Sequence, residues 1–235
     1  MKQKYIILIL STLFLFACSS GKKRLEQGDY DAAVYKAVNR LQQKPNHEKA
    51  LNVLGEAYTL AVNEHMAHIA AIDKSTDPLR FAQMVNEYQQ VDYLNIAIRR
   101  YPKYANLLEL VDVTNEIALT KKRAAIAFEN KGVELLQANR KDLAREAYYA
   151  FVDANSYVSN QISASRLQNA LDAGTVNVVL EFENDRRYFR DFNTDMVFND
   201  VLSNFKNSRY TFMRVIDPGD SRFEPDEIVY VELDD

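Results

Sequence analysis

Three neighbouring side chains in the first third of the chain have types and a spacing that could bind a metal ion. His65 and His68 are three residues apart, and Glu64 precedes the first of them. In a helix this spacing places both imidazoles on one face, where they could share a cation. The zinc-protease pattern differs, because its two histidines are four residues apart with a glutamate directly after the first. We therefore expect ordinary packing or surface histidines here, and neither a metal site nor another cofactor.

The only cysteine, Cys18, is the next residue with distinctive chemistry. It ends a nearly continuous apolar run over residues 5–17, and Lys2 and Lys4 precede that run. A basic start, an apolar core and a small residue at the cleavage position are the layout of a secretory signal. The run is about 13 residues long, whereas a membrane-spanning helix needs about 20. The pattern thus predicts a cleaved signal peptide rather than a spanning anchor.

The sequence Leu15-Phe16-Ala17-Cys18 resembles the lipobox of bacterial lipoproteins. The resemblance implies that residues 1–17 are removed and that Cys18 carries diacylglycerol on its sulfur and an acyl chain, such as palmitate, on its new amino group. Several acyl chains anchor a protein stably where one binds only marginally. Ser19, rather than an aspartate, follows the cysteine, which resembles the sorting pattern for the outer membrane. A plain signal peptide is the alternative, and it would leave Cys18 as a free thiol.

Composition excludes several classes of function. The chain has 29 Lys and Arg against 33 Asp and Glu, and loss of the signal removes Lys2 and Lys4, which leaves a net charge of −6. A nucleic-acid-binding protein needs a basic surface, so we expect no nucleic-acid partner. The chain has three histidines, no tryptophan, no glycine-rich phosphate loop and no Gly-x-Ser-x-Gly motif. This inventory does not suggest an enzyme.

The long middle of the chain predicts helices. Only 6 glycines and 5 prolines occur in 235 residues, so few residues interrupt regular structure. Gly28 permits a tight turn before a first helix, and Pro45 ends that helix because it lacks an N–H. The pattern from Glu48 to Asp73 predicts one long helix, and Asp77-Pro78 predicts the start of the next.

Part of this pattern resembles the tetratricopeptide repeat, a hairpin of two antiparallel helices. The matching positions are Gly28, Tyr30, Ala33, Leu41, Pro45, Leu54, Gly55 and Tyr58. Arg40 departs from the pattern, since the family has a small residue there. Ala33 and Gly55 are expected to allow close approach of neighbouring helices, and Leu41, Leu54 and Tyr58 to fill the space between them.

The pattern recurs twice with a weaker match to the repeat, first before Tyr101-Pro102 and then around Gly132 and Ser156. The intervals exceed the usual 34 residues of this repeat, so longer or additional helices are expected. We predict a lipidated tether over 18–24 and a TPR-like helical array over 25–173. Such arrays usually bind a peptide or a partner protein, and a helical bundle without a binding groove is the alternative.

Residues 174–235 predict a small α/β segment with the order β-α-β-β. Strands are expected at 176–182, 210–216 and 227–233, with a helix over 194–206 between the first two. The order of the first three elements is similar to the periplasmic α/β domain of curli-secretion channel lipoproteins. Because the third strand runs almost to the last residue, we expect either that the domain is incomplete or that its open edge binds a partner.

The loop after the first of these strands is the second candidate site. Arg186, Arg187, Tyr188 and Arg190 combine cations with an aromatic ring, which could bind a partner, an anionic glycan or a phospholipid headgroup. A solvated loop is the plainer interpretation.

Together these features favour a mainly α protein that is not an enzyme. We expect a lipid-anchored outer-membrane scaffold or adaptor on the periplasmic side, which binds an envelope protein through its helical repeats. The alternative is an accessory lipoprotein of cell-wall synthesis or of an envelope secretion complex, acting through the C-terminal α/β segment.

Overall fold

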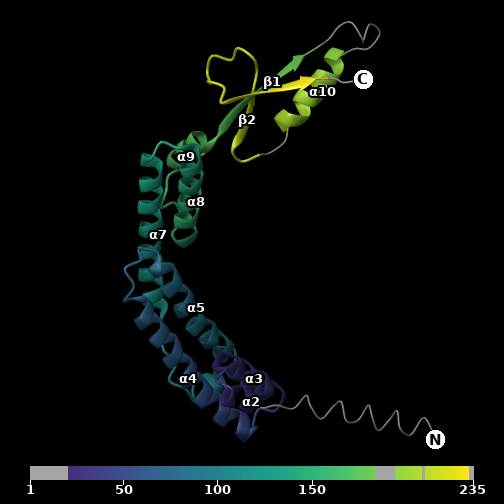
Figure 1. Cartoon of the computed structure of the whole chain (residues 1–235). Coiled ribbons are helices and arrows are strands. Elements are labelled where there is room, and N and C mark those ends of the chain that lie inside the picture. The colour runs from purple at the N-terminus through teal and green to yellow at the C-terminus, as the bar shows by residue number, and fades with distance from the viewer. Residues whose placement is uncertain (1–20, 184–193, 208–209, 233–235) are drawn as a thin grey trace, which may run out of the picture. The chain divides into compact units, whose positions relative to one another are not determined.

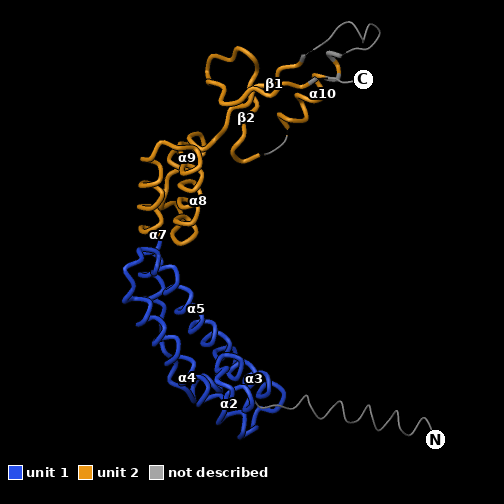
Figure 2. Tube along the Cα trace, viewed as in Figure 1, with its two compact units in different colours: residues 1–124 blue, residues 125–235 orange. Residues whose placement is uncertain are grey.

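The computed structural model describes residues 21–183, 194–207 and 210–232. Cys18 and the predicted loop site at residues 186–190 lie outside the described residues. The chain is mainly helical and ends in a small parallel sheet, as the sequence predicts (Figure 1). It divides into two compact units, Met1–Ala124 and Ala125–Asp235, and the boundary falls within one helix (Figure 2).

The first unit is built from helices that follow one another with short turns. Gly28 has a φ of 77°, the left-handed conformation expected for it before the first long helix. The helix predicted to begin at Glu48 is a single helix of 25 residues. The described helices that begin in this unit are α2 (Lys22–Glu26), α3 (Tyr30–Gln43), α4 (Glu48–Ile72), α5 (Arg80–Arg99), α6 (Pro102–Ala105) and α7 (Thr114–Gln137).

The core of the first unit lies where α4 packs against both α3 and α5. Leu41, Leu54 and Tyr58 are buried in it, as expected from their spacing. The hydroxyl of Tyr104, on α6, donates to the backbone oxygens of Leu41 and Pro45, each at 3.1 Å. This side chain thereby satisfies one carbonyl in the last turn of α3 and one in the turn that follows it.

Two turns differ in detail from the sequence-based prediction. Helix α5 begins at Arg80, because the Asp77 carboxylate accepts a hydrogen bond from the Leu79 N–H at 2.8 Å and stabilises a turn before the helix. Pro102 does not end α5. It is the first residue of α6, where its missing N–H costs nothing.

The helices of the second unit pack around Phe151, which is completely buried. Helix α8 (Lys141–Tyr157) packs against α9 (Ala164–Gly174). The C-terminal part of α7 approaches α8 closely, since a Cβ added at Gly132 would lie 2.4 Å from a ring carbon of Phe151. At Gly55, by contrast, an added Cβ would lie 3.7 Å from Leu108, an ordinary contact. The close approach expected at Gly55 is therefore absent there.

The sheet follows the predicted order of elements. Strand β1 (Val176–Glu183), helix α10 (Thr194–Asn207), β2 (Met213–Ile216) and β3 (Glu227–Glu232) form a sheet with the strand order β2-β1-β3. Both pairings are parallel, with Val179 opposite Ile216 on one side and opposite Ile228 on the other. Strand β2 is shorter than the predicted 210–216. The central position of β1 agrees with its continuous run of buried apolar residues.

Side chains of α8 bond to the end of α9 and to the residues directly before β1 and β3. Lys141 Nζ lies 3.1 Å from the Asp226 carboxylate and donates to the Thr175 carbonyl at 2.6 Å. Arg145 donates to the Gly174 carbonyl at 2.8 Å. Among the described helices, none is both long enough and apolar enough to cross a membrane.

Candidate functional site

An open groove on the first unit is the candidate binding surface. It lies between α3 and α5, with a volume of about 290 Å³. Helix α4 packs against both α3 and α5, and these two helices also contact each other. Its lining residues are Tyr35, Val38, Asn39, Gln42, Tyr93, Ile96, Ala97 and Arg100.

The groove combines apolar and hydrogen-bonding groups. Tyr35, Tyr93 and Ile96 are large apolar side chains that remain exposed. Burial of part of the Tyr35 ring, together with Asp31 and Tyr93, raises the pKa of its hydroxyl, which therefore stays protonated and can donate. Arg100 is exposed and forms no ion pair with any described residue. The surface thus offers aromatic contact, hydrogen-bond donors and an uncompensated positive charge, which suit a peptide segment with an apolar and an acidic side chain.

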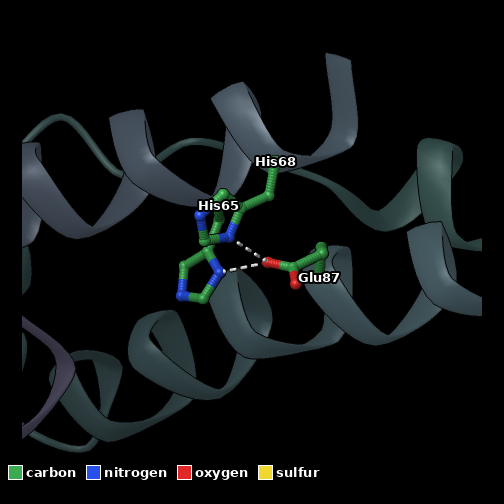
Figure 3. A group of neighbouring side chains, drawn as sticks. All are labelled: His65, His68 and Glu87. Carbon is green, nitrogen blue, oxygen red and sulfur yellow. Dashed lines mark hydrogen bonds and ion pairs between the residues drawn. The ribbon is translucent and has the colours of Figure 1, made fainter. Parts of the chain in front are cut away.

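A second cluster surrounds His65 on α4. This imidazole is buried, with 8% of the residue exposed. Its Nδ1 lies 2.7 Å from Glu87 Oε2 on α5, and its Nε2 lies 3.2 Å from the Asp31 carboxylate on α3. His68 Nδ1 lies 3.4 Å from the same Glu87 oxygen, so both imidazoles converge on one carboxylate (Figure 3).

The electrostatics of this cluster favour a protonated His65. The hydrogen bond to Asp31 and, more weakly, the one to Glu87 together raise the pKa of His65 to about 9, against the opposing effect of burial. At neutral pH the imidazole therefore carries a proton on each nitrogen and donates to both carboxylates. The three helices α3, α4 and α5 are joined at this point by charge-assisted hydrogen bonds.

The candidate metal-binding residues of the sequence are only partly brought together. The spacing of His65 and His68 does bring them together, but Glu64 is exposed, and the carboxylates that contact His65 are Asp31 and Glu87. They are 34 and 22 residues away in sequence, and no local pattern could have identified them. The groove between α3 and α5 was also not identified from the sequence, because local spacing does not show which side chains of two helices come together at the surface.

Comparison with known proteins gives no match: no protein-family model, no curated protein and no solved structure is significantly similar to this chain.

Proposed function

We propose that this protein is a lipid-anchored scaffold of the bacterial envelope, which holds a partner protein on its first helical unit. Cys18, with the signal-like sequence before it, would supply the anchor to the outer membrane, facing the periplasm. The observation that carries the binding role is the groove between α3 and α5, which is lined by exposed aromatic and aliphatic side chains together with polar ones.

The physical reason is that a contiguous cluster of exposed apolar side chains commonly marks an interaction site. Single exposed apolar residues are ordinary, but Tyr35, Tyr93 and Ile96 gather in one concave site. Tyrosine and arginine are the residue types that contribute most at protein interfaces. The occupant we propose is a peptide segment of an envelope protein, with its apolar side chain between the tyrosines and a carboxylate at Arg100.

The test is an affinity pull-down of the lipidated protein from detergent-solubilised envelopes. The groove variant is Ile96→Glu, and the matched control is Leu119→Glu, on the first unit but outside the groove. Both side chains are aliphatic and well exposed, at 42% and 53%, so neither change should unfold the protein. We expect a stoichiometric partner that is retained by Leu119→Glu, lost with Ile96→Glu and reduced with Cys18→Ala. A partner bound equally by both glutamate variants would refute the groove as its site.

A second candidate function rests on the C-terminal sheet. Among the described strands β3 lies at one edge, and Ile228, Val229 and Tyr230 in it are exposed. An open edge can accept a further strand from a partner, as expected for an accessory protein of cell-wall synthesis or secretion. The same pull-down with Tyr230→Lys tests this function, because a charge on an edge strand opposes strand addition. Loss of the partner with this variant alone would favour the sheet over the groove.

A further inference from the structure

We propose that His65, His68 and Glu87 form a binding site for a divalent transition-metal ion, with Zn²⁺ as the best fit, which joins α4 to α5. The expectation from spacing alone was ordinary histidines, because Glu64 did not complete a known pattern. The structure supplies a third donor from another helix, Glu87. This site is separate from the groove between α3 and α5 and does not depend on the proposed scaffold function.

The distances suit a small tetrahedral cation. One donor atom from each of the three residues lies within 4.8 Å of the others. Zinc bonds of about 2.0–2.1 Å at tetrahedral angles place neighbouring donors about 3.3 Å apart. The separation of His68 Nδ1 from Glu87 Oε2 is already 3.4 Å, whereas that of His65 Nδ1 from the same oxygen is 2.7 Å. The cation would replace the proton that His65 shares with Glu87, and the Glu87 carboxylate and the exposed His68 side chain would move to bring the three donors to bonding distance.

Asp31 has the position of an outer carboxylate behind a metal-binding histidine. It accepts from His65 Nε2 at 3.2 Å, on the side of the ring away from Glu87. Metal-binding histidines usually donate their second N–H to a carboxylate, which fixes the tautomer and the orientation of the ring. Nε2–H would stay bonded to Asp31 when a cation displaces the Nδ1 proton, and the Nδ1 lone pair, which is directed towards Glu87, would then bind that cation.

The donor set and the charge select the class of metal. Two imidazole nitrogens and one carboxylate oxygen are a zinc ligand set, whereas Ca²⁺ and Mg²⁺ prefer oxygen ligands alone. Once the cation has displaced the Nδ1 proton of His65, Asp31 and Glu87 leave the cluster a charge of about −2, which a divalent cation neutralises. The His68 side chain is 55% exposed, so a cation can enter from solvent and a water molecule can complete its coordination. The bound ion would have a structural role, since it connects two helices of the first unit.

The experiment is a titration of the EDTA-treated, dialysed full-length protein with ZnCl₂, followed by calorimetry and by thermal unfolding. Variants His68→Ala and Glu87→Gln remove one ligand each, and His68 is exposed enough for its loss to leave folding intact. The matched control is His47→Asn, because His47 is the third histidine of the chain and caps α4 through its Nδ1, a role that asparagine can keep.

We expect one Zn²⁺ per chain, a higher melting temperature with Zn²⁺ and none of this with Mg²⁺ or Ca²⁺. Affinity should fall about tenfold or more in His68→Ala and stay unchanged in His47→Asn. Failure of the wild-type protein to bind Zn²⁺ stoichiometrically, or equal affinity in His68→Ala and His47→Asn, would overturn the proposal. Equal stabilisation by Mg²⁺ would overturn it as well.

Discussion

Replacing Tyr58 by phenylalanine should destabilise the first unit far more than the loss of one oxygen suggests. The Tyr58 hydroxyl donates to Asn95 Oδ1 at 2.7 Å and accepts from the Val111 N–H at 2.8 Å. Asn95 in turn donates to the Val111 carbonyl at 2.8 Å, and its side chain is completely buried. This small network joins α4 and α5 to the segment before α7.

The magnitude follows from the two partners that Tyr58→Phe leaves behind. Asn95 Oδ1 loses its donor and the Val111 N–H loses its acceptor, and each buried unpaired group costs about 1–3 kcal/mol. Since Val111 is partly exposed and water can reach it, we expect a total loss of about 2–4 kcal/mol in the free energy of unfolding. With an ordinary urea dependence, this shifts the unfolding midpoint of the first unit down by about 1–2 M.

The assay is urea unfolding of the protein, followed by far-UV circular dichroism. The control is Tyr88→Phe, because Tyr88 is also partly buried against the same core but no described residue bonds to its hydroxyl. It should cost less than about 0.5 kcal/mol. A double variant with Asn95→Leu should lose less than the sum of the two single losses, because both changes break one network. Equal effects of Tyr58→Phe and Tyr88→Phe, or additive losses in the double variant, would refute the reasoning.

Three further predictions concern other parts of the chain. Gly132→Ala should be more destabilising than Gly55→Ala by about 1–3 kcal/mol, because both variants gain the same helix propensity but only the first forces a methyl group against a buried ring. Thermal unfolding of the two variants measures this difference, and equal melting temperatures would contradict it. Asp226→Asn should cost about 1 kcal/mol at pH 7, because a backbone N–H and Lys141 hold the pKa of this carboxyl below its ordinary value of 3.8. This stabilisation is present above the ordinary pKa and is lost as the pH falls through the lower folded-state pKa. The difference in unfolding free energy between wild type and variant, measured by chemical denaturation, should therefore shrink below pH 4, and a difference that grew there would contradict this role of Asp226. Metabolic labelling with a palmitate analogue should label the wild-type protein in bacterial envelopes and leave Cys18→Ala unlabelled, whereas label in the variant would exclude this residue as the attachment site.

The elements of the fold could be predicted because their signals are local. The long apolar periodicity after Glu48 and the scarcity of glycine predicted α4, and the alternation of strand-like and helix-like segments after Gly174 predicted the order β-α-β-β. Turn details were less accurate. Asp77 and Pro102 are both residues that favour the start of a helix, and only the contacts around them determine at which residue the helix begins.

The candidate sites could not be predicted as fully, because they depend on packing between helices. Glu87 reaches His65 only because α5 lies against α4, and Asp31 reaches it only because α3 lies on another side. Gly55 and Gly132 occupy equivalent-looking positions in the sequence, yet only Gly132 has a neighbouring ring against its Cα. Such differences are set by tertiary contacts and have no trace in local spacing.

The most direct test of the scaffold function is site-specific photocrosslinking in living cells. A photoreactive residue replaces Tyr93 in the groove, and in a parallel strain it replaces Leu119 outside it; both native side chains are exposed. A scaffold that holds its partner between α3 and α5 should give one discrete crosslinked protein in the membrane fraction from position 93 and none from position 119. The same adducts from both positions, or none from position 93, would contradict the proposed function.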